Sequence, residues 1–210
     1  MKKIPTLFVR DYTQRIDGVN PMTPEVNSGC EWVLGGEGVA TRKWDGLAVM
    51  HRDGQWFKRY DAKAFTIDKT TGQKRVYDRK PPESFEPLQD PDPETGHWPG
   101  WIKCSIDDSA DKLLFDTIAM YSENHLENGT YELVGPKIGT RGGANPENLD
   151  KHIIVRHGAD ALDAPRTFDG LRSFLESNDI EGIVWHRENG DMVKIKARDF
   201  GIQRGAKVKV

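Results

Sequence analysis

The pattern of hydrophobic and polar residues along the chain predicts strands more often than helices. Residues 39–50 and 55–60 read as two strands joined by a tight hairpin, because Asp53-Gly54 is a pair typical of such turns. This hairpin would bring Lys58 and Arg59 back alongside Lys43. Further strands are predicted at residues 130–134, 152–156, 183–186 and 192–196, and the last two form a second hairpin that turns at residues 188–191.

Two stretches carry the signals of a helix. Residues 109–126 place apolar and aromatic side chains on one face, with Ser109 as N-cap and Asn128-Gly129 as the stop signal. Residues 167–177 form the second helix, with Thr167 as its N-cap. The fold class we expect is therefore α+β, with mostly antiparallel sheets flanked by helices.

A chain of 210 residues fits a single domain with a sizeable core. Within residues 1–210 we expect an irregular N-terminal arm at 1–30, a proline-rich loop at 69–100 and a basic tail at 197–210. Loops as long as the second of these are uncommon without structure of their own and are often functional. Its aromatic end, residues 96–101, is expected to pack the loop down.

Composition narrows the class of protein. The formal net charge is -3, which argues against indiscriminate nucleic-acid binding, but the charges are segregated. Residues 194–210 hold six basic residues and one acid, whereas residues 83–95 hold five acids and no base. Such segregation allows a basic working face on a mildly acidic protein.

The two cysteines, Cys30 and Cys104, stand in no Cys-x-x-Cys motif, so a structural zinc site is not expected. A reducing, cytoplasmic setting fits this cysteine usage. The apolar run at residues 4–9 is too short for a signal peptide, and no run reaches the length of a membrane span. We expect a cytoplasmic protein with no membrane contact and no obligate protein partner.

The tetrapeptide Lys43-Trp44-Asp45-Gly46 is the first candidate for chemistry. Alone it is equally typical of a solvated turn beside a strand. Other charged residues also interrupt or adjoin strands that are otherwise apolar: Glu132, Glu181, Lys194 and Lys196. Lys194 and Lys196 are two apart and so share a strand face, and Glu181, just ahead of the partner strand, can lie near them. Taken singly, each is typical of the solvated face of a half-buried strand.

Four motifs follow one another along the chain: Lys43-Trp44-Asp45-Gly46, Tyr131-Glu132-Leu133-Val134-Gly135, Glu181-Gly182-Ile183-Val184-Trp185 and Val193-Lys194-Ile195-Lys196. In this order they resemble motifs I, III, IV and V of the nucleotidyl-lysine superfamily of ATP-dependent ligases and mRNA-capping enzymes. Together with residues 96–101, they are most similar to the RNA ligase 1 family of 5′ to 3′ RNA ligases. The resemblance implies an ATP-grasp-like nucleotidyltransferase domain, the ligase adenylylation domain. Only 14 residues follow Lys196, so we expect no C-terminal OB-fold.

The resemblance gives each motif residue a role. Lys43 resembles the nucleophile that becomes adenylylated, and Lys194 and Lys196 resemble the pair that faces the α-phosphate. A lysine attacks only as the neutral amine, although its ordinary pKa is about 10.4, and nearby cations favour that neutral form. Glu181 resembles the carboxylate on the metal side. Its hard oxygens, with Asp45 or Glu132 acting through water, suit Mg²⁺ or Mn²⁺.

Four further residues are expected to hold the nucleotide. Glu132 resembles the glutamate that holds the ribose, and Arg59 resembles the motif Ia arginine. Adenine should be sandwiched by a side chain from the strand after motif III, for which His152 and Ile154 are the candidates. A histidine at such a place is more often structural. ATP is the nucleotide that the resemblance implies, since the spacing alone does not demand ATP over GTP.

The implied reaction has three steps and serves RNA repair. Lys43 takes AMP from ATP, the AMP passes to an RNA 5′-phosphate, and a 3′-hydroxyl displaces it to seal the strand. The alternatives are a nucleotidyltransferase that transfers AMP or GMP without sealing, and a non-catalytic module that binds RNA ends. Lys58, Arg59 or the tail lysines are our candidates to orient pyrophosphate. The basic residues of the tail either contact phosphate or form an ordinary solvated end: Arg198, Arg204, Lys207 and Lys209.

Overall fold

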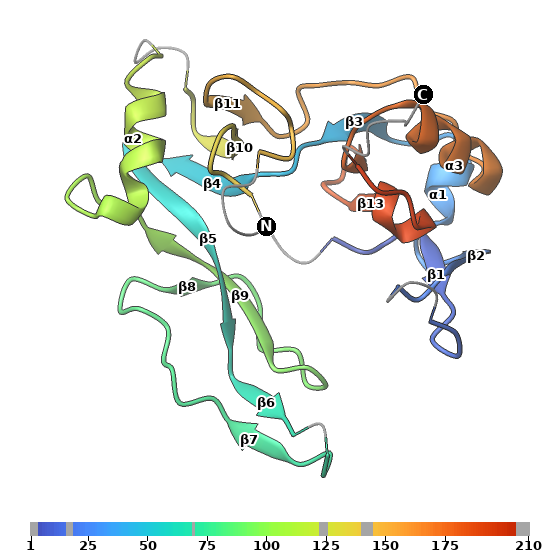
Figure 1. Ribbon diagram of the computed structural model, residues 1–210, viewed down its shortest axis with the longest axis horizontal. Helices are drawn as coiled ribbons and strands as arrows, with labels where there is room; N and C mark the ends of the chain where they lie inside the picture. The colour runs from blue at the N-terminus through green and yellow to red at the C-terminus, as the bar shows by residue number, and fades with distance from the viewer. Residues whose placement is uncertain (1–3, 16–18, 69, 122–125, 140–144, 205–210) are drawn as a thin grey trace. The chain divides into compact units, whose positions relative to one another are not determined.

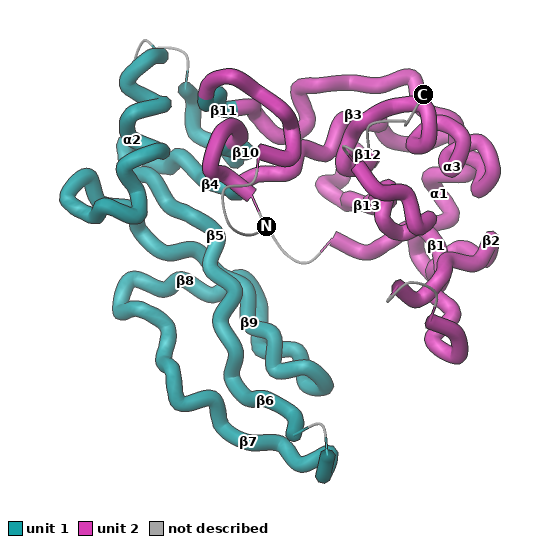
Figure 2. Tube along the Cα trace, viewed as in Figure 1, with its two compact units in different colours: residues 1–3, 47–133, 152–154 teal, residues 4–46, 134–151, 155–210 magenta. Residues whose placement is uncertain are grey.

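The computed structural model shows a chain of mixed α and β structure, with mostly antiparallel sheets and few helices (Figure 1). The chain forms two compact units, coloured separately in Figure 2. Unit 1 contains residues 47–133 and 152–154, and unit 2 contains residues 4–46, 134–151 and 155 onwards. The structure describes residues 4–15, 19–68, 70–121, 126–139 and 145–204. Among these residues, no helix is long and apolar enough to cross a membrane.

Unit 1 is built on a six-stranded sheet with the strand order β11-β10-β4-β5-β9-β8. Its strands are β4 (Leu47–Arg52), β5 (Gln55–Lys63), β8 (Glu86–Pro87), β9 (His97–Lys103), β10 (Gly129–Val134) and β11 (Ile153–Arg156). The hairpin between β4 and β5 is confirmed, and its turn residues Asp53 and Gly54 both have positive φ, which suits an Asp-Gly pair. A small hairpin of β6 (Phe65–Ile67) and β7 (Lys74–Val76) continues beyond the end of β5 (Figure 1).

Unit 2 is built on the three-stranded antiparallel sheet β13-β12-β3. Its strands are β3 (Val39–Lys43), β12 (Gly182–His186) and β13 (Met192–Lys196), so the second predicted hairpin is confirmed. The remaining elements of this unit are β1 (Phe8–Arg10), β2 (Met22–Val26), α1 (Glu31–Leu34), α3 (Phe168–Ser177) and the 3₁₀ helix η3 (Ala197–Phe200). The predicted helix at 167–177 is also confirmed, because Thr167 caps α3 by accepting a hydrogen bond from the Gly170 amide at 3.2 Å.

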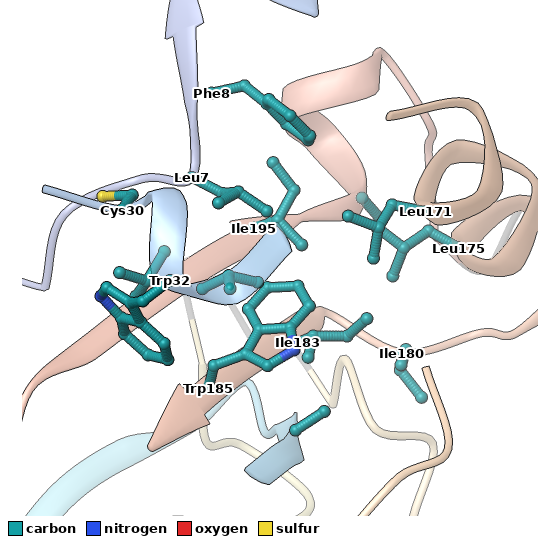
Figure 3. Packing of buried hydrophobic residues seen from close by; sticks show 14 residues of the cluster. Leu7, Phe8, Cys30, Trp32, Leu171, Leu175, Ile180, Ile183, Trp185 and Ile195 are labelled. Atoms are coloured by element: carbon teal, nitrogen blue, oxygen red, sulfur yellow. The ribbon is translucent and has the colours of Figure 1, made fainter. Parts of the chain in front are cut away.

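One face of the unit 2 sheet carries the core. Ile183 and Trp185 of β12 and Ile195 of β13 are fully buried, and they pack with Leu171 and Leu175 of α3 (Figure 3). Because side chains alternate along a strand, the residues between them face the other side of the sheet. This alternation leaves Lys194 and Lys196 on the face away from the core, as their spacing predicts.

The N-terminal segment is more ordered than an irregular arm. Thr6 pairs in parallel with Lys194, the Leu7 amide donates to the Lys194 carbonyl at 2.8 Å, and the Lys194 amide donates to the Pro5 carbonyl at 3.0 Å. Leu7 and Phe8 are buried in the core. The segment therefore extends the sheet beside β13, and β1 pairs with β2, because its apolar residues cover core that would otherwise be exposed.

The single strand predicted at residues 39–50 is wrong. β3 ends at Lys43 and β4 begins at Leu47, and the two strands belong to different sheets. The residues between them, ending in Asp45-Gly46, interrupt the strand pattern with turn-forming types. As a result, the β4–β5 register sets Lys58 opposite Val49 and does not place it beside Lys43.

The predicted helix at 109–126 is too long. The structure has a 3₁₀ turn η1 (Ser109–Asp111) followed by α2 (Lys112–Ile118), and residues 122–125 lie outside the described part. The side-chain cap is Asp108, which accepts from the Ala110 amide at 2.9 Å, and not Ser109. After α2 the amides of Met120 and Tyr121 bond to carbonyls three residues back, so the helical turn tightens and ends early.

The loop predicted at 69–100 is also partly wrong, since β7, β8 and the start of β9 lie within it. β9 pairs with β5 at seven positions, from Phe57 opposite Lys103 to Lys63 opposite His97. The expectation that aromatic residues pack this segment down is confirmed. Trp101 is buried, and the Trp98 indole packs on Phe85 at 5.0 Å between ring centroids.

Candidate active site

The centre of the site is Glu181, whose carboxylate lies between two lysines of unit 2. Lys43 Nζ is 2.5 Å from Glu181 Oε2, and Lys196 Nζ contacts the other oxygen, Oε1. The sheet register produces this arrangement, because Gly182 of the central strand is paired with Lys43 of β3 and with Lys196 of β13. Glu181, one residue ahead of Gly182, therefore meets both ammonium groups. The three side chains are mostly buried, which strengthens their electrostatic interaction.

Gly182 allows the strands to approach closely enough for this contact. A Cβ at this position would lie 2.1 Å from the Ile195 carbonyl oxygen and 2.9 Å from the Lys196 Cα. No side chain fits at such distances. The Ala197 amide also donates to the Glu181 carbonyl at 2.9 Å, which fixes the backbone of the carboxylate. Gly182 thus allows the close approach of the strands that places the Glu181 carboxylate between the two lysines.

Lys194 adds a third cation to the same sheet face. It lies two residues before Lys196 on β13 and is paired with Val184 of β12. Burial, followed by the charges of Lys196 and Lys43, lowers the pKa of Lys194 to about 8. Its backbone is held on the outer side by Pro5 and Leu7. Three lysines against the two carboxylates of Glu181 and Asp45 leave a net positive site, which suits the phosphates of a nucleotide.

The two carboxylates of the site are shifted in opposite directions. Burial alone would raise the pKa of Glu181, but Lys43 and Lys196 outweigh it and the net pKa is lowered. Burial, and then the charge of Glu181, raises the pKa of Asp45 against the opposing effect of Arg204 and the lysines. Glu181 is thus the better anion, and its hard oxygens fit Mg²⁺ or Mn²⁺.

Within the described residues, no group of three or more His, Cys, Asp or Glu side chains is arranged to hold a metal ion. Glu181 pairs with Lys43, and Asp45 follows Lys43 by two residues, so the two carboxylates belong to the same part of unit 2. A magnesium ion that keeps most of its waters needs only one or two carboxylates, so this donor set fits such an ion.

Sequence reasoning missed several residues of unit 2 that surround the site. His186 shares the sheet face with Lys194, and its Nε2 lies 3.1 Å from Thr41 Oγ1. Burial, and then the charge of His157, lowers the pKa of His186, which favours the neutral ring. His186 lies four residues after Gly182 in the same strand, and this even spacing in the sequence indicates that both residues share one face of the sheet.

Glu147 was also missed, although its side chain is completely buried and contacts the Lys43 segment. It follows a glycine- and asparagine-rich stretch with no strand or helix pattern, so no sequence signal pointed to it. Arg204 of the tail is ion-paired with Asp45 at 3.4 Å and with Glu147 at 3.2 Å. Arg198 is exposed, and Lys207 and Lys209 lie outside the described residues.

The structure brings together five of the predicted site residues in unit 2: Lys43, Asp45, Glu181, Lys194 and Lys196. The other four predicted residues belong to unit 1. Glu132 is buried on β10, Ile154 is buried on β11, and His152 immediately precedes β11. Arg59 on β5 donates to Asp61 at 3.0 Å.

Lys58 has a structural partner that the sequence did not reveal. Its ammonium contacts the buried carboxylate of Asp111, which also accepts from the Ser105 amide at 3.0 Å. This ion pair already engages the Lys58 ammonium, which weakens the candidacy of Lys58 as a pyrophosphate ligand.

Comparison with known proteins agrees with the motif pattern. A protein-family model described as RNA ligase 1 matches residues 102–208, slightly more than half of the chain. The matched part contains Glu132, Glu181 and both lysines of β13, whereas Lys43 precedes it. No curated protein matches the chain.

Substitution of Gly182 tests whether close strand approach sets the site. If Lys43 is the nucleophile that its motif implies, the rate of its covalent labelling by α-labelled ATP should fall at least about tenfold in Gly182→Ala, because the new Cβ must displace β13. Gly190→Ala is the matched control, because its Cβ would meet no atom within 4 Å, although its positive φ costs some stability. An unchanged rate in Gly182→Ala would show that the contact does not matter.

The lowered pKa of Lys194 predicts a pH-dependent stability. Between pH 8 and 10.5 the unfolded chain keeps this proton while the folded chain releases it, so raising the pH favours folding. The free energy of unfolding of the wild type, relative to Lys194→Met, should therefore rise across this window and stay constant below it. Urea denaturation of both proteins at several pH values measures the difference, and a difference independent of pH contradicts the assignment.

Proposed function

The chain belongs to the RNA ligase 1 family, and from that premise we propose that it is an ATP-dependent RNA ligase. In this proposal it joins an RNA 5′-phosphate to a 3′-hydroxyl through a covalent lysyl-AMP and an adenylylated RNA 5′ end. Both units serve one nucleotidyltransferase domain that acts in the cytoplasm. The two free, buried cysteines support a reducing compartment.

One observation carries this proposal: Lys43 and Lys196 share the carboxylate of Glu181, and Lys194 lies on the same sheet face. A module that only binds RNA ends has no need of a lysine whose neighbours are two more lysines and a carboxylate. Both suit a nucleophilic lysine, because the two further lysines offset the charge that builds on the α-phosphate and the carboxylate provides the metal side of the same site.

The first step forms a bond between Lys43 Nζ and the α-phosphorus of ATP. The Lys43 ammonium must leave Glu181 and pass a proton to solvent water before the amine can attack, and pyrophosphate leaves with the electron pair of the broken P–O bond. Lys194 and Lys196 offset the charge that builds on the α-phosphate oxygens. Mg²⁺, which Glu181 would hold with Asp45 through water, would supply further charge stabilisation.

The later steps transfer and then release AMP. An oxygen of the RNA 5′-phosphate attacks the phosphorus of lysyl-AMP, and Lys43 departs as the free amine. The 3′-hydroxyl then attacks the 5′-phosphate, forms the phosphodiester bond and expels AMP. We assign Glu132 to the ribose, Arg59 to the phosphates, and His152 or Ile154 to the adenine. The burial of Glu132 and Ile154 supports a role at the base and sugar, where water is excluded.

Covalent labelling tests the proposed reaction. The protein is incubated with α-labelled ATP or GTP and Mg²⁺, and the label that stays on the protein through denaturing gel electrophoresis is measured. We expect label from ATP on the wild type, no label above background on Lys43→Ala, and no label when Mg²⁺ is chelated. Addition of 5′-phosphorylated RNA should discharge the label as free AMP together with a sealed strand.

Lys112→Ala is the matched control, because Lys112 is an exposed lysine that pairs only with Asp116. It should be labelled like the wild type. Equal labelling of Lys43→Ala and wild type would contradict the assignment of the nucleophile. Transfer of AMP or GMP to RNA without sealing would identify a nucleotidyltransferase, and RNA binding with no label at all would identify a binding module.

A further inference from the structure

We propose that Glu147 is a positioning residue that holds the residues on both sides of Lys43, the side chain of Arg42 and the backbone amide of Asp45, and so places the amine for attack. This inference rests on the proposed function and adds to it a residue outside the four motifs. Glu147 reaches neither Lys43 nor Glu181 in the contacts of the site. Its effect on the reaction is transmitted through Arg42, Asp45 and Arg204.

The side chain of Glu147 is completely buried, and its carboxylate accepts two hydrogen bonds and forms an ion pair with a third group. Arg42 Nη2 lies 2.7 Å from Oε2, the Asp45 amide lies 2.8 Å from Oε1, and Arg204 Nη2 lies 3.2 Å from Oε1. A buried carboxylate is stable only when its oxygens are matched by donors of this kind. The three groups come from β3, from the residues after β3 and from the C-terminal segment, so one side chain ties three parts of unit 2 together.

The first two donors flank the nucleophile. Arg42 precedes Lys43 directly, and the Asp45 amide lies two residues after it. The Arg42 guanidinium also stacks on the Trp44 ring at 3.7 Å, so that side chain is fixed through the same contact. The Arg42 amide donates to the Asp160 carbonyl at 2.8 Å, which anchors the incoming strand. With both flanks held, only the side chain of Lys43 is left to move between Glu181 and a substrate.

Lys43 is the last residue of β3, which explains why the contacts of Glu147 are needed there. β3 is paired with β12 as far as Lys43, where Gly182 is its partner, and the next residues belong to no strand. Strand pairing therefore constrains Lys43 from one side only. The Asp45 amide would otherwise have no partner in the sheet, and Glu147 supplies one.

Arg204, from the C-terminal segment, also holds Glu147 in place. It bridges Glu147 and the Asp45 carboxylate, and it donates to the Pro146 carbonyl at 2.9 Å. Pro146 is the neighbour of Glu147, so Arg204 holds both the backbone and the side chain of this segment. Removal of the Glu147 carboxylate would leave two guanidinium groups without their shared partner, which is more disruptive than loss of one hydrogen bond.

The test compares Glu147→Ala and Glu147→Gln with the wild type in single-turnover formation of lysyl-AMP. A displacement of reacting atoms by about 1 Å costs about 100-fold in rate. We expect Glu147→Ala to lose about that factor at saturating ATP, while the ATP concentration for half-maximal rate changes little. Glu147→Gln should lose less, because its carbonyl oxygen can still accept from the Asp45 amide.

Thr167→Ala separates positioning from general instability. It removes the N-cap of α3 in the same unit, and the hydrogen bonds of Thr167 within the described part of the chain go to Gly170 and Leu171, neither of which belongs to the site. When the proteins are compared at temperatures equally far below their melting points, Thr167→Ala should keep the wild-type rate. Equal losses of rate in Thr167→Ala and Glu147→Ala would overturn the proposal.

A second readout requires no ATP. An amine-directed acylating reagent modifies lysines at rates that depend on their exposure and partners, and peptide mass spectrometry gives the ratio of Lys43 to Lys112 modification. Loss of the contacts of the Glu147 carboxylate should raise this ratio severalfold in Glu147→Ala. An unchanged ratio would overturn the proposal. If the wild type forms no lysyl-AMP, the proposed function fails, and the modification ratio alone decides whether Glu147 positions Lys43.

Discussion

The contact on which the site depends is the carboxylate of Glu181 shared between the ammonium groups of Lys43 and Lys196. The three side chains come from three separate strands of unit 2, or from the residue next to a strand, and they lose most of their hydration when they meet. Their mutual attraction offsets that loss. The shared carboxylate also limits repulsion among three lysines on one face, which a sheet this small could not otherwise hold together.

The rest of unit 2 supplies the geometry that this contact demands. The apolar face of β12 and β13 packs on α3 and on the N-terminal segment, so the sheet cannot slip in register without exposing Trp185 and Ile195. Gly182 lets the strands come close, and Glu147 ties the chain where β3 ends. The hydrophobic core, the strand register and the residues after β3 together determine the position of the Lys43 amine.

Local sequence patterns predicted the structural features that are determined by residues close together in the chain. The spacing of Lys194 and Lys196 gave their common face, and Thr167 gave the start of α3. The break at Asp45-Gly46 was missed because two strands of different sheets follow one another with little to separate them. Glu147 could not be found, since its role comes from three partners distant in sequence and from no period of its own. The motif order linked Glu181 to Lys43, whereas the shared pairing of Gly182 with both lysines required the structure.

Peptide mass spectrometry of the protein after reaction with ATP and Mg²⁺ tests the central claim most directly, because it locates the covalent adduct on the chain. AMP attached through a phosphoramide bond to Lys43, and to no other lysine, is the predicted result. AMP on Lys194 or Lys196 instead, or no adduct on any lysine, would contradict the assignment of Lys43 as the nucleophile that shares Glu181 with Lys196.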